Sequence, residues 1–164
     1  MIQKKICMLG ASAVGKTSLV KQFVEGIFSD KYLTSIGVKI DKKKLEVDET
    51  TVQLMLWDIE GVDRYAGFNP KYLRGAAAAI IVVDQTRTQS FLEGIEICRL
   101  VKLEKEIPIF LVANKSDLPK SESWDSAADC GVTSLFELSF STSAKTGEGV
   151  EDMFLNVAKA ALNK

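Results

Sequence analysis

The sequence predicts an α/β protein: one domain over residues 1–164, with a six-stranded, mostly parallel sheet. One edge strand is antiparallel, and about five helices flank the sheet. Short apolar segments alternate with amphipathic ones, which is the pattern of strands joined by helices. Most of the apolar segments lack polar alternation, as expected of strands buried on both faces. The 164 residues, 46% of them hydrophobic, can form the core of one ordinary domain.

Six strands are predicted from their apolar or alternating residues, at 4–10, 38–47, 51–58, 78–84, 107–115 and 136–140. The segment VKIDKKKLEV at 38–47 is the most polar of them. The turn DET at 48–50 joins it to the strand that follows, so these two strands are expected to form a hairpin at the edge of the sheet.

Five helices are predicted between the strands, at 16–26, 69–75, 90–105, 123–130 and 149–162. The segment at 69–75 is short and the one at 123–130 is weak. In the segment 90–105 apolar residues recur at helical spacing, for example Phe91, Ile95 and Cys98. The last helix shows the same spacing.

Composition excludes several classes of function. The chain has no histidine, which rules out His-dependent triads and His-ligated zinc within it. A net charge of −1 gives no support for nucleic-acid binding. The three cysteines form no CxxC pair, and a reduced, cytoplasmic chain is expected. We expect no membrane anchor of its own, because apolar runs are short and the last residues contain no cysteine.

The segment GASAVGKT at 10–17 matches G-x-x-x-x-G-K-[ST], between a predicted strand and a predicted helix. Its backbone N–H groups and the helix N-terminus can bind phosphate oxygens. Lys16 can reach the β- and γ-phosphates, and the Thr17 hydroxyl can ligate Mg²⁺. The alternative is an ordinary glycine-rich turn, which the strand–loop–helix context disfavours.

The segment NKSD at 114–117 lies at the carboxyl end of a predicted buried strand, where α/β sheets bind ligands. The Asp117 carboxylate could accept hydrogen bonds from the guanine N1–H and 2-amino group, a donor pair that adenine lacks. TSAKTG at 142–147 supplies a second loop. By itself NKSD could be a polar turn, but its position after a phosphate loop favours base recognition.

The order and spacing of these motifs, with DIEG at 58–61, resemble the Ras superfamily of small GTPases over essentially the whole chain. The segments TSIGV (34–38), LMLWD (54–58) and YLRGA (72–76) are most similar to the Rab branch. The resemblance implies a P-loop NTPase G domain that binds GDP or GTP with Mg²⁺, hydrolyses GTP and acts as a molecular switch. A divergent segment at 59–63 would suit a prokaryotic or early-branching member.

The resemblance also implies the residues that bind the nucleotide. Asn114 would support the loops, the Lys115 stem would lie over the purine, and the Ala144 N–H would bind the guanine O6. Phe28 would meet the base and Tyr32 would cover the phosphates, although both could be ordinary core or surface aromatics. The full implied set is Gly10, Ala11, Ser12, Ala13, Val14, Gly15, Lys16, Thr17, Ser18, Phe28, Tyr32, Asn114, Lys115, Asp117, Leu118, Ser143, Ala144 and Lys145.

For the metal, the resemblance implies ligation by Thr17 and Ser35, with Asp58 acting through water. Ser35 replaces the family's threonine but keeps the hydroxyl, and the neighbouring Thr34 is a less suitable substitute. The Gly61 N–H would bind the γ-phosphate, completing with Lys16 and Ser35 the implied catalytic set. Residues 28–38 and 60–74 are therefore expected to differ between the GDP and GTP states.

The segment at 58–63, DIEGVD, departs from the family's D-T-A-G-Q-E. Val62 replaces the glutamine that orients the attacking water, so slow hydrolysis is expected. Glu60 replaces alanine and either repels the γ-phosphate or positions the water itself. The alternative function is a scaffold locked in its GDP or GTP form without a catalytic cycle. An ATP-using kinase would leave NKSD and SAK unexplained.

The effector surface implied by the Rab likeness consists of Ile40, Trp57 and Tyr72. Because residues alternate along a strand, Trp57 should face away from the apolar set that includes Leu54 and Leu56. We expect an exposed aromatic patch, the alternative being a Trp half-buried under a helix. The partners implied are effectors, exchange factors and GTPase-activating proteins. The chain is expected to be monomeric and to reach membranes only through partners.

Overall fold

The computed structural model describes residues 1–28, 37–59, 69–128 and 132–163. Within these ranges the strands are β1 (Ile2–Leu9), β2 (Val38–Val47), β3 (Thr50–Ile59), β4 (Ala76–Asp84), β5 (Ile109–Asn114) and β6 (Leu138–Ser141). The helices are α1 (Lys16–Glu25), α2 (Thr88–Glu104), α3 (Trp124–Ala128) and α4 (Val150–Leu162), with 3-10 turns η2 (Pro70–Leu73) and η3 (Val132–Leu135).

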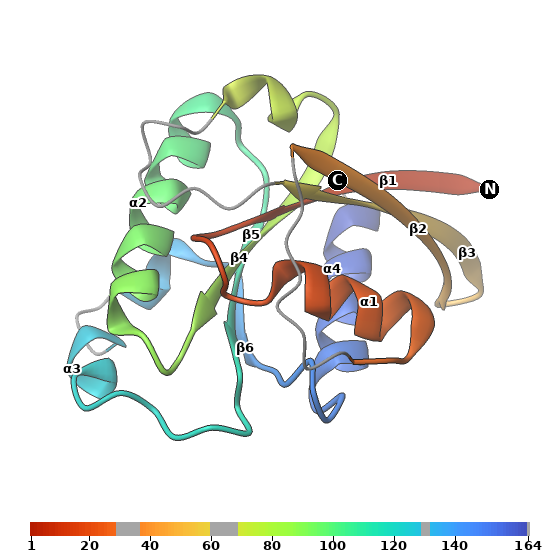
Figure 1. Cartoon of the computed structure of the whole chain (residues 1–164). Coiled ribbons are helices and arrows are strands. Elements are labelled where there is room, and N and C mark those ends of the chain that lie inside the picture. The colour runs from red at the N-terminus through yellow and green to blue at the C-terminus, as the bar shows by residue number, and fades with distance from the viewer. Residues whose placement is uncertain (29–36, 60–68, 129–131, 164) are drawn as a thin grey trace.

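The six strands form one sheet in the order β2-β3-β1-β4-β5-β6 (Figure 1). Every neighbouring pair is parallel except β2 and β3, which form the antiparallel edge hairpin. The predicted fold class is therefore confirmed. The hairpin turn uses Asp48 and Glu49, both with positive φ, as a two-residue turn between twisted strands requires.

The helix prediction needs one correction, because the described residues contain four α-helices rather than about five helices. The segment predicted at 69–75 is the 3-10 turn η2. Pro70 begins it and the Asn69 side chain accepts a hydrogen bond from the Lys71 N–H. Gly75, with φ 72°, ends the segment before β4, so there is no room for an α-helix. The turn η3 was not predicted.

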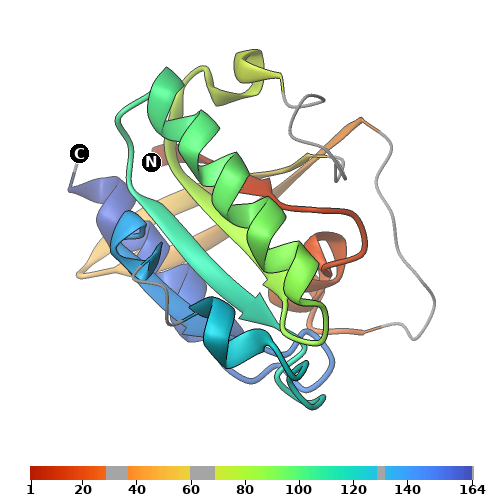
Figure 2. The ribbon, with the colours of Figure 1, turned by 90° about the vertical axis from the view of Figure 1, so that its left-hand side faces the viewer.

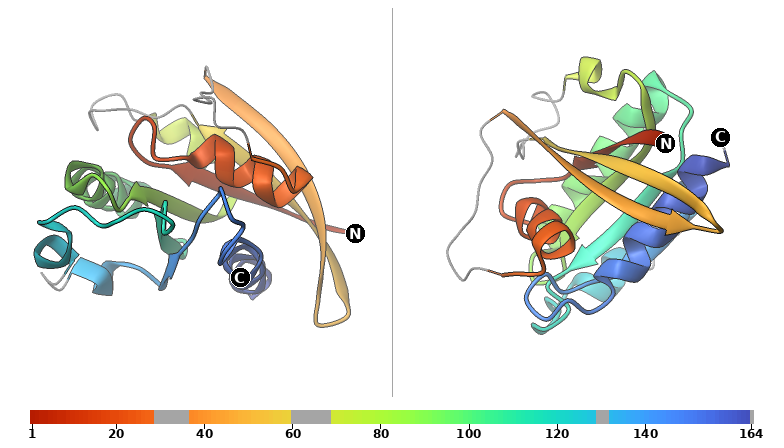
Figure 3. Two further views of the ribbon diagram at one scale, coloured as in Figure 1. Left: turned by 60° about the horizontal axis from the view of Figure 1, so that its bottom comes forward. Right: turned by 90° about the vertical axis from the view of Figure 1, so that its right-hand side faces the viewer.

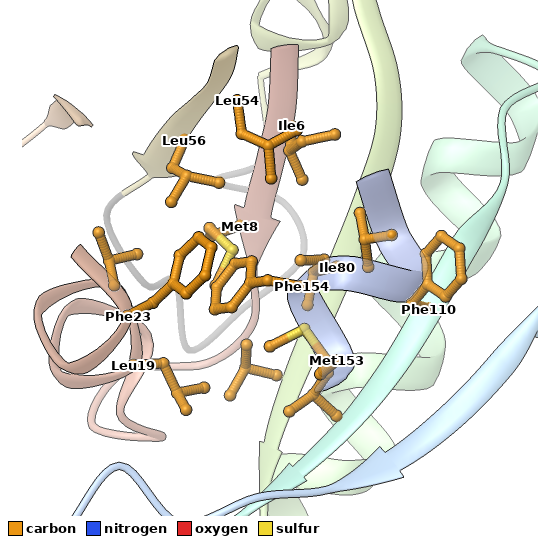
Figure 4. Close-up of a cluster of buried hydrophobic side chains, with 14 of the residues drawn as sticks. Ile6, Met8, Leu19, Phe23, Leu54, Leu56, Ile80, Phe110, Met153 and Phe154 are labelled. Carbon is orange, nitrogen blue, oxygen red and sulfur yellow. The ribbon is translucent and has the colours of Figure 1, made fainter. Parts of the chain in front are cut away.

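Two apolar clusters lie on opposite faces of the sheet. The first joins α1 and α4 to the inner sides of β1, β3 and β4 (Figure 4). At its centre the rings of Phe23 and Phe154 stack with centroids 4.0 Å apart. The second cluster packs α2 and α3 on the other face. Figure 2 shows the molecule with α2 in front, and the right-hand view of Figure 3, from the opposite side, shows α1 and α4.

The sheet places several loops at one edge. Since β1, β3, β4 and β5 are parallel, their carboxyl ends share that edge. The register pairs Met8 with Asp58 and Asp84 with Asn114. The phosphate-loop motif, the aspartate of DIEG and the asparagine of NKSD are therefore brought together by strand pairing.

Candidate functional site

The loop at residues 10–15 connects β1 to α1 and contains two sterically required glycines. Gly10 has φ 145° and Gly15 has φ 101°, values that L side chains rarely adopt. A Cβ at Gly10 would overlap the Val82 carbonyl oxygen, and one at Gly15 would overlap Nδ2 of Asn114. The loop thus lies directly against the ends of β4 and β5.

Lys16 opens α1 and is only 5% exposed. Its ammonium group donates to the carbonyl oxygens of Gly10 at 3.2 Å and Ala11 at 2.9 Å. The side chain therefore folds back along the loop instead of extending into solvent. A buried cation in this position suits the binding of a phosphate group.

Thr17 and Asp58 form the part of the site that fits a metal ion. The Thr17 hydroxyl donates to Oδ2 of Asp58 at 2.6 Å. The other carboxylate oxygen, Oδ1, is buried without a hydrogen-bond partner among the described residues. Burial raises the pKa of Asp58, while the Thr17 hydrogen bond and the Lys16 charge act in the opposite direction. A hydroxyl beside a carboxylate with an unused oxygen is a suitable donor set for Mg²⁺.

Asn114, at the end of β5, connects three loops. Its Nδ2 donates to the Val14 carbonyl at 3.0 Å. Its Oδ1 accepts from the Thr142 hydroxyl at 3.2 Å and from the Ala144 N–H at 3.3 Å. These bonds hold the phosphate loop, NKSD and TSAKTG in fixed relation, which is the supporting role that the motif implies for Asn114.

Asp117 and Ser143 come from the two loops expected to bind a base. The Ser143 hydroxyl donates to Oδ1 of Asp117 at 2.8 Å. Asp117 itself is exposed, as are Leu118, Lys145 and Phe28, which is 38% exposed. The Asp117 carboxylate is therefore accessible to solvent, and it could accept hydrogen bonds from the donor edge of a planar ligand.

Sequence reasoning missed a buried carboxylate at the centre of this edge, Asp84, which is 1% exposed. Its Oδ2 lies 2.8 Å from the Lys115 ammonium and 3.1 Å from Nε of Arg87. Its Oδ1 accepts hydrogen bonds from the N–H and hydroxyl of Thr86. The only signal in the sequence was a charged residue ending the apolar segment AAIIVVD.

The two cations that bind Asp84 also bind the phosphate loop. Lys115 donates to the Ala13 carbonyl at 3.1 Å, and Nη2 of Arg87 donates to the Ser12 carbonyl at 2.8 Å. Burial by itself would raise the pKa of Asp84, but the hydrogen bonds from Lys115, Thr86 and Arg87 outweigh it and hold that pKa below its ordinary value.

The depressed pKa gives a pH-dependent prediction for Asp84→Asn. Because the folded-state pKa lies below the ordinary 3.8, the stabilisation is complete above that pH and is lost as the pH falls through the folded-state pKa. The melting temperature of the variant should be lower than that of the native chain near neutral pH. The difference between the two melting temperatures should become smaller below about pH 4. Thermal unfolding across this range measures it.

Asp125→Asn is the control for this series, because Asp125 is exposed and lies 3.7 Å from Lys120 in a solvated pair. It should follow the native chain at every pH. If the difference in melting temperature between Asp84→Asn and the native chain stays constant down to acid pH, the depressed pKa of Asp84 is contradicted.

The proposed effector residues are close together, but their exposure differs from the prediction. Ile40 pairs with Trp57 across β2 and β3 and is 46% exposed. Trp57 and Tyr72 are half-buried and pack against the second apolar cluster. The Lys5 ammonium lies 3.6 Å from the centroid of the Trp57 ring. Trp57 does face away from the Leu54 and Leu56 set, yet it is partly covered rather than fully exposed.

Several predicted site residues lie outside the described residues, namely Tyr32, Ser35, Glu60, Gly61 and Val62. Their roles stay predictions. In the described part of the chain, no helix combines the length and apolar character needed to cross a bilayer.

Comparison with known proteins agrees with this geometry. The model of the Ras family matches residues 5–163. The chain is 32% identical over 158 residues to the Ras-related protein Rab-21 of Dictyostelium discoideum, an alignment covering 94% of this chain and 74% of that protein. Both findings confirm the resemblance inferred from the motifs. The chain therefore belongs to the Ras superfamily of small GTPases and is Rab-like.

Proposed function

We propose that this GTP-binding switch hydrolyses GTP slowly without a partner and persists in its GTP state. The observation that carries the proposal is Val62, which replaces the glutamine of the family pattern. Phosphoryl transfer depends on positioning and electrostatics, with a polar side chain orienting the attacking water. Valine has no polar atom for that task.

The remaining parts of the site support nucleotide binding. Lys16 and the loop N–H groups would hold the phosphates, and Asp117 with Ser143 would bind guanine. Thr17 and Ser35 would ligate Mg²⁺ directly, and Asp58 would hold the ion through a water molecule. When bound, the ion neutralises charge on the phosphates. Replacing the glutamine by Val62 would therefore impair the positioning of the attacking water and leave nucleotide binding intact.

One end of the proposed second switch is attached to the sheet. The carbonyl oxygens of Tyr72, Leu73 and Arg74 accept hydrogen bonds from Cys7 at 3.2 Å, Lys105 at 3.3 Å and Lys5 at 2.7 Å respectively. These three bonds fix consecutive carbonyls at the end of η2 and at its C-cap, Arg74. A conformational change in response to nucleotide would then be confined to the residues before this attachment.

We also propose that effectors, exchange factors and GTPase-activating proteins bind through residues 28–38 and 60–74. A monomer in the cytoplasm, recruited to membranes by such partners, fits the family and the near-neutral charge. A GTPase-activating partner could supply an arginine and replace the missing water-orienting group.

The proposal is tested by single-turnover hydrolysis of preloaded GTP. Val62→Gln is expected to hydrolyse GTP about tenfold faster than the native chain or more, equivalent to about 1.4 kcal/mol of the barrier. Val62→Leu is the matched control, because it changes size without adding a polar atom, and it should stay near the native rate.

Two other outcomes would contradict the proposal. If the native chain already matches Val62→Gln, another group positions the water, and loss of rate in Glu60→Ala would identify it as Glu60. If Val62→Gln also fails to hydrolyse GTP, the chain is a nucleotide-locked scaffold. Nucleotide occupancy after purification, measured by chromatography of the released nucleotide, would then show whether the locked state holds GDP or GTP.

A further inference from the structure

We propose that Arg87 is a positioning residue of the phosphate loop. Held by Asp84, its guanidinium group fixes the Ser12 carbonyl outward and so directs the Ala13 N–H toward the phosphates. This inference deepens the proposed function and rests on its nucleotide site. Arg87 immediately precedes α2, whose first turn lies beside the loop between β1 and α1 (Figure 2).

The guanidinium group bridges two fixed points. Nε lies 3.1 Å from Oδ2 of Asp84, and Nη2 donates to the Ser12 carbonyl at 2.8 Å. Asp84 is nearly fully buried and is itself oriented by two hydrogen bonds from Thr86. The Arg87 N–H also donates to the Asp84 carbonyl at 2.9 Å. The arginine is therefore held at its backbone and at its side chain.

Because the peptide bond is planar, the contact between Arg87 and the Ser12 carbonyl also sets the direction of the next N–H group. In a planar trans peptide the carbonyl of one residue and the N–H of the next point in opposite directions. When Arg87 binds the Ser12 carbonyl on the outer side, the Ala13 N–H is directed to the inner side. Lys115 has the same effect one residue later, because it binds the Ala13 carbonyl at 3.1 Å.

The loop needs such support at this position. Ala13 has φ 63°, a left-handed conformation that costs a non-glycine residue free energy. Its two flanking carbonyls, those of Ser12 and Ala13, are held by two cations that share one carboxylate. Asp84, together with Arg87 and Lys115, thus stabilises the backbone conformation that turns consecutive N–H groups toward a phosphate.

Arginine and lysine should not be equivalent here. A guanidinium group is a planar fork that can bind Asp84 and Ser12 at once, whereas an ammonium group is a compact point charge on a flexible stem. Arg87→Lys keeps the charge and loses the bridge. Comparing it with Arg87→Ala therefore separates positioning of the loop from simple attraction of a cation to phosphate.

The test is the dissociation rate of fluorescently labelled GDP in the presence of Mg²⁺. Because the Arg87 side chain is 45% exposed, the expected effect is moderate: about a tenfold faster rate for Arg87→Ala, and nearly as much for Arg87→Lys. Arg99→Ala is the matched control. Arg99 lies on α2, the helix that follows Arg87, in an exposed pair with Glu96, and its loss should leave the rate unchanged.

A second measurement observes the loop directly. In the GDP complex, the amide resonances of Ala13 and Val14 should shift in Arg87→Ala and Arg87→Lys but not in Arg99→Ala. The inference is overturned if Arg87→Ala releases GDP at the native rate, or if Arg87→Lys comes within about twofold of native, since charge alone would then suffice. A native chain that fails to retain GDP would instead contradict the nucleotide site itself.

Discussion

Gly15→Ala is expected to abolish tight nucleotide binding and to lower the free energy of unfolding by about 3 kcal/mol or more. A Cβ at this position would overlap Nδ2 of Asn114. Asn114 is 1% exposed and bonds Val14, Thr142 and Ala144, so it cannot move without breaking these contacts. The φ of 101° adds backbone strain for alanine.

Gly26→Ala is the control that separates steric overlap of the new Cβ from the backbone strain of a positive φ. Gly26 also has a positive φ, 72°, but its Cβ would meet open space. This variant should lose only about 1 kcal/mol and keep its affinity for GDP. Chemical denaturation and GDP titration of both variants measure the two effects. Equal losses in the two variants would mean that the close contact with Asn114 is unimportant.

Asp117→Asn is expected to weaken GDP binding by about a hundredfold or more and to favour xanthosine diphosphate. A carboxylate accepts from the guanine N1–H and 2-amino group, whereas an asparagine amide places a donor against one of these donors. Xanthine carries a carbonyl in place of the 2-amino group, which the amide can bind. The Ser143 hydroxyl, which donates to Oδ1 of Asp117, can still bind the asparagine oxygen.

Titration of the native chain and the variant with GDP and xanthosine diphosphate checks this prediction. Asp125→Asn removes another exposed carboxylate, one paired with Lys120, and should leave both affinities at native values. A uniform loss for both nucleotides would indicate that Asp117 only supports the loop. Unchanged GDP affinity would remove it from the base site altogether.

Much of the fold followed from local pattern. The segment VKIDKKKLEV predicted β2 with the bounds that the structure gives, because polar alternation and a following turn are strong local signals. The short helical segment predicted at 69–75 is present as a 3-10 helix over Pro70–Leu73 rather than as an α-helix, and the reason is local as well. Pro70 and Gly75 leave space for one short turn between them, which outweighs the apolar pattern.

The site was predictable where a motif has fixed spacing and a strand edge gathers its parts. Lys16, Thr17 and Asn114 belong to this class. Asp84 and Arg87 were missed because their partners, Lys115 and Ser12, are far away in sequence and belong to other elements. Such bridges depend on strand register and loop conformation. The sequence left open whether Trp57 is exposed or half-buried, because its burial depends on the second apolar cluster and on Lys5 from a neighbouring strand.

Two hydrogen bonds connect the loops of the site to each other and to α1: Asn114 donates to the Val14 carbonyl at 3.0 Å, and Gln22 on α1 donates to the Ala144 carbonyl at 2.8 Å. Because of these bonds, we expect the loop that would bind the base and the loop that would bind the phosphates to move together. A partner protein that displaces either loop, or α1, would then be expected to disturb both parts of the site. Release of a bound nucleotide would then involve both loops, and a partner acting on α1 could promote it without contacting the base.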